Sequence, residues 1–293
     1  RGDDANRIFV KAEAQSGEFD EAGFIPSPTP PYQTRPPRGY NRGGFVHGSW
    51  ARRLREGAEV AGGAWYERLE RRLQPTDEHS DTFDIGVRYG TELGGAHTLT
   101  TGALYRQIKH ETASTFQLTF TLPNRTLHQW SAYLQDEIRL DERFGATLGV
   151  RVEDNPFTGL EWQPDLRLSW SVTDRQLLWA AVGRAVRTPT FADESRTFVT
   201  RVSPPGSAGP RSSAVLNQVA GDPNLESEDL IAYQLGWRGR WNNDAMLSAS
   251  VFYNDYDRLI LYVPEPVDTV SLAPQFWTLA LTPVNDGTAH SHG

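Results

Sequence analysis

The sequence predicts an all-β chain, an antiparallel up-and-down transmembrane β-barrel of which about a dozen strands are present. Three observations lead to this fold class. Apolar and polar residues alternate, tight turns and longer connections separate the alternating segments, and aromatic residues gather near the segment ends. A helical membrane protein is excluded, because no uncharged apolar run reaches the ~18–20 residues that a spanning helix needs.

Composition narrows the class of protein further. The 293 residues carry a formal net charge of −8, which argues against general affinity for nucleic acid. Cysteine is absent, so the chain can form neither disulfides nor thiolate metal sites. The chain begins at Arg1 without an initiator Met or a signal-like segment, so either processing removed that segment or the chain is a fragment of a longer protein. The strand count and the motifs described below favour a fragment.

Period-two alternation is strongest in five segments. In the first of them Phe83, Ile85 and Val87 fall on one face of a strand, whereas Asp84 and Arg88 fall on the other. The five segments lie at about 82–89, 143–153, 165–173, 231–238 and 247–254.

Weaker alternation extends the series to about a dozen strands. Asp136 is one exception, since it interrupts an otherwise apolar row that includes Leu134 and Ile138. The weaker strands are expected at about 7–15, 45–55, 58–70, 98–109, 129–140, 175–187 and 276–282. Residues 285–293 look like the start of a further strand.

The connections between the strands differ in length in a regular order. Tight turns are expected at 55–57, 93–96, 141–142, 173–174 and 241–244. Longer connections are expected near 17–41, 71–80, 110–127, 154–162, 188–228 and 263–275. Because short and long alternate, a barrel would carry the turns at one rim and the loops at the other, as outer-membrane barrels do.

A soluble β-sandwich or propeller would also show alternation and turns. Strands of ~10–14 residues exceed the usual five or six, whereas a tilted membrane strand needs ~9–11. The polar faces of the alternating segments carry charged and amide side chains, as expected of residues that face a water-filled lumen. Aromatic residues near the strand ends fit the girdles of a membrane barrel: Trp50, Trp65, Tyr66, Tyr105, Trp130, Trp179, Trp237 and Trp241.

Several stretches resemble the barrel domain of the TonB-dependent outer-membrane receptors. The segment 132–138, with the sequence AYLQDEI, resembles a recurrent strand opening of that family, and 221–228 is similar to its GNPxLxPE signature. Asp222 and Ser227 depart from that signature, where Asn and Pro are commoner. The further stretches that resemble family strands are 148–153, 162–170, 178–189, 232–238 and 250–256. The clear resemblance covers about residues 130–262.

The resemblance implies that residues 1–293 are part of a ~22-stranded barrel domain, with the plug domain and the terminal strands missing. It implies outer-membrane, TonB-dependent uptake of a scarce large ligand, most often a ferric siderophore. This segment would form barrel wall and extracellular loops. The implied partners are that ligand, the TonB protein acting through the missing plug, and membrane lipid and lipopolysaccharide, with no nucleic acid. No enzyme activity, cofactor or metal is implied.

Other functions stay open at this point. A passive porin or adhesin barrel would share the wall, and a secreted soluble β-sandwich binding protein would share the alternation. An outer-membrane lipase or protease is a third alternative, but no G-x-S-x-G, P-loop or H-E-x-x-H motif supports it.

Candidate ligand residues are cations and aromatics in the longer connections, because such side chains suit an anionic ligand that bears rings. The Pro-rich loop Phe24–Gly44 contains Tyr32, Arg35, Arg38 and Tyr40. The connection 188–228 contains Arg196, Arg201 and Arg211, and the strand before it ends with Arg184 and Arg187. The simpler interpretations are a solvated loop kept extended by proline and arginines that anchor a strand at the polar rim.

Overall fold

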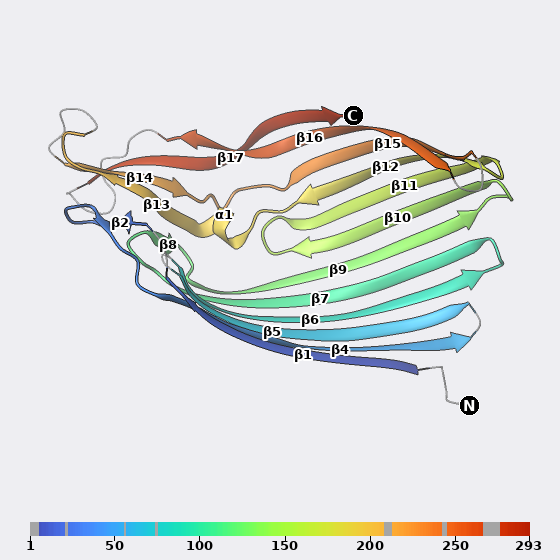
Figure 1. Ribbon diagram of the computed structural model, residues 1–293, viewed down its shortest axis with the longest axis horizontal. Helices are drawn as coiled ribbons and strands as arrows, with labels where there is room; N and C mark the ends of the chain where they lie inside the picture. The colour runs from blue at the N-terminus through green and yellow to red at the C-terminus, as the bar shows by residue number, and fades with distance from the viewer. Residues whose placement is uncertain are drawn as a thin grey trace.

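The computed structural model describes residues 6–20, 23–55, 57–73, 76–207, 213–241, 245–265 and 276–293. Within these residues the chain forms one 15-stranded sheet and a separate two-stranded sheet. Figure 1 shows the long strands side by side in one curved layer, with the shorter elements gathered at one end. The predicted all-β class is confirmed.

Twelve long strands make the wall of the described part, and each pairs antiparallel with the wall strand before it. This matches the dozen strands expected from alternation. They are β1 (Asn6–Phe19), β4 (Gly39–Arg55), β5 (Ala58–Leu73), β6 (Thr76–Leu93), β7 (His97–Ala113), β9 (Asn124–Arg139), β10 (Phe144–Asn155), β11 (Gly159–Thr173), β12 (Gln176–Arg187), β15 (Glu228–Arg240), β16 (Met246–Pro264) and β17 (Phe276–His292).

The two faces of the wall differ in chemistry. Leu148, Leu168 and Leu235 remain 49%, 47% and 54% exposed, on a face that carries apolar side chains from strand to strand. The opposite face carries polar pairs such as Arg106 and Asp84, which are cross-strand neighbours. An outer face that is apolar and exposed, backed by a polar inner face, is the arrangement of a membrane barrel.

The remaining elements come from the connections and lie at one end of the wall (Figure 1). They are β2 (Ile25–Pro26), β3 (Gln33–Thr34), β8 (Leu118–Phe120), α1 (Phe191–Ser195), β13 (Arg196–Ser203) and β14 (Ala214–Ala220). We call the described parts of 114–123 and 188–227 the loop annex. No helix in the described part of the chain is long and apolar enough to cross a membrane.

The loop annex extends the sheet beyond its last wall strand. β14 pairs in parallel with the first half of β17, β13 pairs antiparallel with β14, and β8 pairs with β13. Val199, Val202, Ala214 and Leu216 form a buried apolar cluster between these strands, and Tyr32 and Phe276 pack against it. The connection predicted at 188–228 is therefore long, as expected, but it is a folded unit.

The prediction that short and long connections alternate strictly is wrong at two places, near 71–80 and 154–162. Only residues 74 and 75 separate β5 from β6, and only 156–158 separate β10 from β11. The strands keep pairing through the charged residues that suggested a loop, since β5 and β6 stay in register up to Leu73 and Thr76. The ion pair of Arg72 Nε with Asp77 Oδ2 (3.2 Å) bridges these two strands.

The last strand was also predicted too short. β17 runs without interruption from Phe276 to His292, so residues 285–293 continue it and do not start another strand. Pro283 and Gly287 look like turn residues in the sequence. Pro283 is fully buried in the sheet, and a Cβ at Gly287 would lie 2.8 Å from the Cβ of Leu259, so only glycine fits there.

Two of the predicted girdle aromatics lie on the inner face. Trp65 stacks on Phe45 with 4.2 Å between ring centroids, and the ring of Trp179 lies over Gly236. Trp130, by contrast, is 57% exposed on the outer face. The exception at Asp136 is accommodated by an ion pair, since its Oδ2 lies 2.7 Å from Nδ1 of His97.

Candidate functional site

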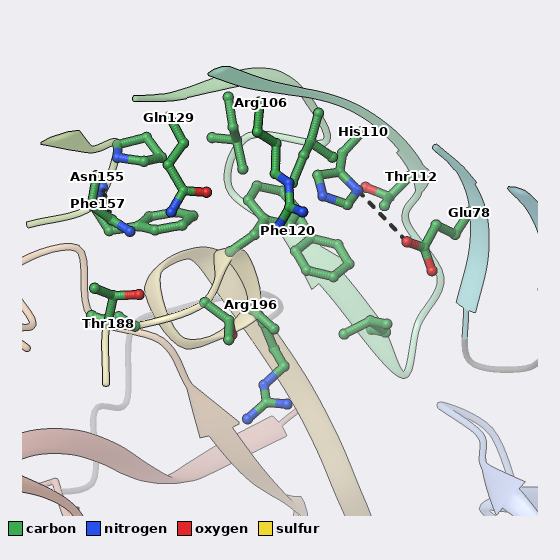
Figure 2. A pocket seen from close by; sticks show the side chains of 18 of the residues that line it. Glu78, Arg106, His110, Thr112, Phe120, Gln129, Asn155, Phe157, Thr188 and Arg196 are labelled. Carbon is green, nitrogen blue, oxygen red and sulfur yellow. Dashed lines mark hydrogen bonds and ion pairs between the residues drawn. The ribbon is translucent and has the colours of Figure 1, made fainter. Parts of the chain in front are cut away.

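A cavity of about 780 Å³ lies between the inner face of the wall and the loop annex. Figure 2 shows Arg106, Gln129 and His110 on its wall side, with Thr188 and Arg196 on the opposite side. The cavity lies at the loop end of the strands, because the annex elements that cover it all belong to connections at that end.

The wall side of the cavity is built by inward residues of β7 and β9. Because side chains alternate along a strand, Arg106, Ile108 and His110 of β7 share the inner face. Arg106 is held in place by Asp84 of β6 through two hydrogen bonds, Nε to Oδ1 at 2.7 Å and Nη2 to Oδ2 at 2.9 Å. Its guanidinium is therefore fixed before any ligand arrives.

A second side of the cavity is the connection between β10 and β11. Asn155 accepts a hydrogen bond from the backbone N–H of Phe157 at its Oδ1 (2.9 Å), and this local turn fixes the connection. The ring of Phe157 lines the cavity (Figure 2). The guanidinium of Arg125 lies over the same ring, 5.4 Å from its centroid.

The roof of the cavity is α1 with its flanking residues. Thr190 and Asp193 close a capping box at the start of this short helix, with the Asp193 N–H donating to Thr190 Oγ1 and the Thr190 N–H donating to Asp193 Oδ2. Phe191 stacks between His110 (5.4 Å, 4°) and Phe120 (5.0 Å, 11°). An aromatic side chain of the roof thus reaches the wall.

The charged groups of the cavity are largely paired. Glu78 Oε1 lies 3.6 Å from Nδ1 of His110 (dashed in Figure 2), and Arg106 is paired with Asp84. Arg196 has no carboxylate partner within the described residues, and its Nη2 lies 3.4 Å from the hydroxyl of Tyr262. Phenyl rings beside one fixed guanidinium and an amide can bind a ligand that carries rings and oxygen acceptors.

Of the candidates from sequence, Arg196 lines the cavity. Tyr32 packs against the annex cluster, and the Arg35 guanidinium lies 5.9 Å from the centroid of the Phe24 ring. Arg38 Nε lies 2.8 Å from Asp20 Oδ1, and that carboxylate raises the pKa of Arg38. Tyr40 lies between the guanidinium groups of Arg42 (5.0 Å) and Arg72 (5.4 Å). These four residues do not line the cavity.

The remaining candidates are also away from the cavity. Arg184 pairs in register with Ile231 of the exposed apolar row, lies over Trp162 and is 2.5 Å from Asp229, so it belongs to the outer rim. Arg187 is ion-paired with Glu228, and Arg201 is exposed on β13. Arg211 lies outside the described residues.

Sequence reasoning missed most of the residues that do line the cavity. Arg106 and Gln129 could have been found, because alternation places them on the polar, inward row of their strands. Phe120, Phe157 and Phe191 carry no such signal, since each lies in a connection whose fold depends on contacts with distant strands.

Comparison with known proteins identifies the family. Residues 26–293 match the family model described as TonB dependent receptor-like, beta-barrel. The ferric enterobactin receptor of Pseudomonas aeruginosa is 27% identical over 143 residues, which are 48% of this chain and 18% of that receptor. The probable TonB-dependent siderophore receptor PirA of Acinetobacter baumannii is 26% identical over 141 residues, again 48% of this chain and 18% of that protein.

Solved structures agree with the fold. The siderophore receptor PirA from Acinetobacter baumannii superposes with a TM-score of 0.74 at 14% identity, covering 100% of this chain and 48% of that one. The corresponding receptor from Pseudomonas aeruginosa gives a TM-score of 0.71 at 16% identity, covering 100% of this chain and 50% of that one. The chain thus spans about half the length of these solved receptors. It belongs to the TonB-dependent receptor family of the bacterial outer membrane, of whose β-barrel domain it forms a part.

Proposed function

We propose that this chain is the wall and loop segment of a receptor that takes up a ferric siderophore by TonB-dependent transport, and that the cavity beneath the annex contacts the ligand. The observation that carries the proposal is the cavity itself, of about 780 Å³, which lies at the loop end of the barrel wall and is lined by rings and a fixed guanidinium. The names of two relatives, a ferric enterobactin receptor and a siderophore receptor, support the same ligand class.

The proposed mechanism is binding followed by transport, without covalent chemistry. The rings of Phe120 and Phe157 would pack against planar rings of the ligand, and the guanidinium of Arg106 would donate hydrogen bonds to its anionic oxygens. Asp84 keeps that guanidinium oriented, so little side-chain entropy is lost when the ligand binds.

The proposed partners follow from the family and lie outside this chain. A plug domain would close the lumen, and TonB would supply energy through that plug. Membrane lipid and lipopolysaccharide would surround the exposed apolar face of the wall. The loop candidates Tyr32, Arg35, Arg38, Tyr40, Arg187, Arg201 and Arg211 remain predictions for first contact with the ligand.

The test is ligand binding by the complete receptor that contains this chain, purified in detergent, with ferric enterobactin, ferrioxamine B, haem, cobalamin and an oligosaccharide as separate probes. We expect a ferric siderophore to bind most tightly. Phe157→Ala should weaken its binding about tenfold, because one ring contact of about 1.4 kcal/mol is lost.

Arg88→Gln is the matched control, since Arg88 lies outside the cavity and its Nη2 pairs with Glu59 Oε1 at 3.0 Å. It should bind like the unaltered receptor. Tighter binding of haem, cobalamin or oligosaccharide than of either siderophore would overturn the proposal, as would unchanged siderophore affinity in Phe157→Ala.

A further inference from the structure

Arg125 of β9 connects two separate sides of the cavity without lining it. Its Nη1 forms an ion pair with Oε2 of Glu194 in α1, and its guanidinium lies 5.4 Å from the centroid of the Phe157 ring. The Arg125 and Glu194 side chains are only 22% and 17% exposed. The Arg125 guanidinium of the wall therefore contacts both the roof and the connection between β10 and β11.

This position distinguishes Arg125 from the other paired arginines of the wall. Arg106 contacts the cavity itself, whereas Arg72 pairs with Asp77 at 3.2 Å on exposed strand residues. An exposed pair contributes little to stability, while a mostly buried pair is costly to break because the remaining charge stays desolvated. Loss of Arg125 would leave Glu194 without its cation at the roof.

The roof also contacts the wall and the rest of the annex. Phe191 stacks between His110 of the wall and Phe120 of the annex. Within the annex, the backbone N–H of Thr121 donates to the carbonyl of Ser195 at 2.9 Å, and that of Asp222 donates to the carbonyl of Asp193 at 3.0 Å. α1 has five residues, too few to hold its own position in the absence of tertiary contacts. The place of the roof over the cavity is therefore set by its tertiary contacts, and the Arg125–Glu194 ion pair and the Phe191–His110 stack are those that join α1 to the wall.

We infer that Arg125 is a positioning residue: through Glu194 and Phe157 it holds the roof and one side of the ligand cavity at their distance from the wall, and so sets the affinity of the receptor for its ligand. The inference rests on the proposed function, since it assigns Arg125 to the same cavity. It concerns the shape of the site, so it predicts weaker binding with unchanged transport once the ligand is bound.

The experiment measures uptake of ferric enterobactin by cells that carry the complete receptor. Arg125→Gln and Glu194→Gln should each raise KM about tenfold or more while the maximal rate changes less than about twofold. The double variant should be no worse than either single variant, because both remove the same pair. Arg125→Lys, which keeps the charge, should recover part of the loss, and Arg88→Gln, which removes an arginine paired with Glu59, should have no effect.

A second measurement does not need ligand. Amide hydrogen exchange of the purified receptor should show faster exchange in residues 188–198 for Arg125→Gln and not for Arg88→Gln. If exchange is faster in Arg125→Gln but the unaltered receptor binds no siderophore, the proposed function is overturned and the positioning role of Arg125 stands. Unchanged exchange together with unchanged KM would overturn the role of Arg125, and so would additive losses in the double variant.

Discussion

The wall and the loop annex are held together in different ways. The wall leaves its large apolar side chains exposed, and from β1 to β12 its described strands bury only Ala58 and Leu127 among apolar residues. The annex buries a compact cluster that includes Val202 and Leu216, which are 5% and 3% exposed. One region has its apolar side outward, toward lipid, and the other has it inward, as a water-soluble domain does.

The wall and the annex therefore obtain their stability from different interactions. The wall depends on continuous backbone pairing between neighbouring strands, together with an apolar solvent around it. The annex depends on removing apolar surface from water, as in any small soluble sheet. The same kind of substitution should therefore have different effects in the two regions.

The largest effect is expected in the annex core. Leu216→Asp should cost about 5 kcal/mol of local stability, because it removes a buried side chain and places a carboxylate among apolar residues. Amide exchange across β13 and β14 should lose its protection while the barrel still folds, as judged by heat-dependent migration on denaturing gels. Arg201→Asp in β13, whose side chain is exposed, is the control and should leave exchange unchanged. Loss of the folded barrel in Leu216→Asp would show that the two regions are not independent.

An intermediate effect is expected on the wall. Leu148→Arg places a charge on the outer face and should lower the unfolding free energy by about 2 to 4 kcal/mol in lipid vesicles. Thr147→Arg, one residue away on the inner face, should lower it by less than about 1 kcal/mol. Denaturant unfolding followed by tryptophan fluorescence makes the comparison. Equal losses for the two variants would contradict the assignment of faces.

The smallest effect is expected at the polar pair on the outer face. The double variant His97→Leu, Asp136→Leu should raise the unfolding free energy by about 1 kcal/mol, because two leucines suit a lipid-facing row better than an ion pair does. The single variant His97→Leu should lower it, since the carboxylate of Asp136 loses its partner. The same unfolding assay measures both. A less stable double variant would mean that the pair stabilises the wall.

The wall could be predicted from sequence because its signal is local. Alternation around Phe83 or Leu148 reports which face a residue occupies, and it needs no knowledge of distant strands. The errors came where polar residues continue a strand past the apolar band, as at Arg72 and Asp77, and where Pro283 lies inside a strand. In both cases pairing with a neighbour overrides the local preference.

The cavity could be predicted only in part, for the same reason. The inward row of β7 identifies Arg106, but nothing in the sequence brings Phe157 or Phe191 to it. Cations in or beside the connections were chosen as ligand candidates, yet Arg38 is ion-paired to Asp20 at the far end of its connection and Arg187 to Glu228 of the neighbouring wall strand. Such partners are decided by tertiary structure and not by the residue type.

The parallel pairing of β14 with β17 sets an order on folding. Most neighbouring wall strands are joined by local hairpins, which close quickly because little chain entropy is lost, whereas 188–227 separate β12 from β15. β14 must wait for a strand that lies far later in the chain, after β15 and β16 have formed. Since β13 and β8 attach through β14, the strand pairing of the annex is completed late, and a chain whose synthesis or insertion stops before Phe276 would hold the described wall strands from β1 to β16 without the strand on which β14 pairs.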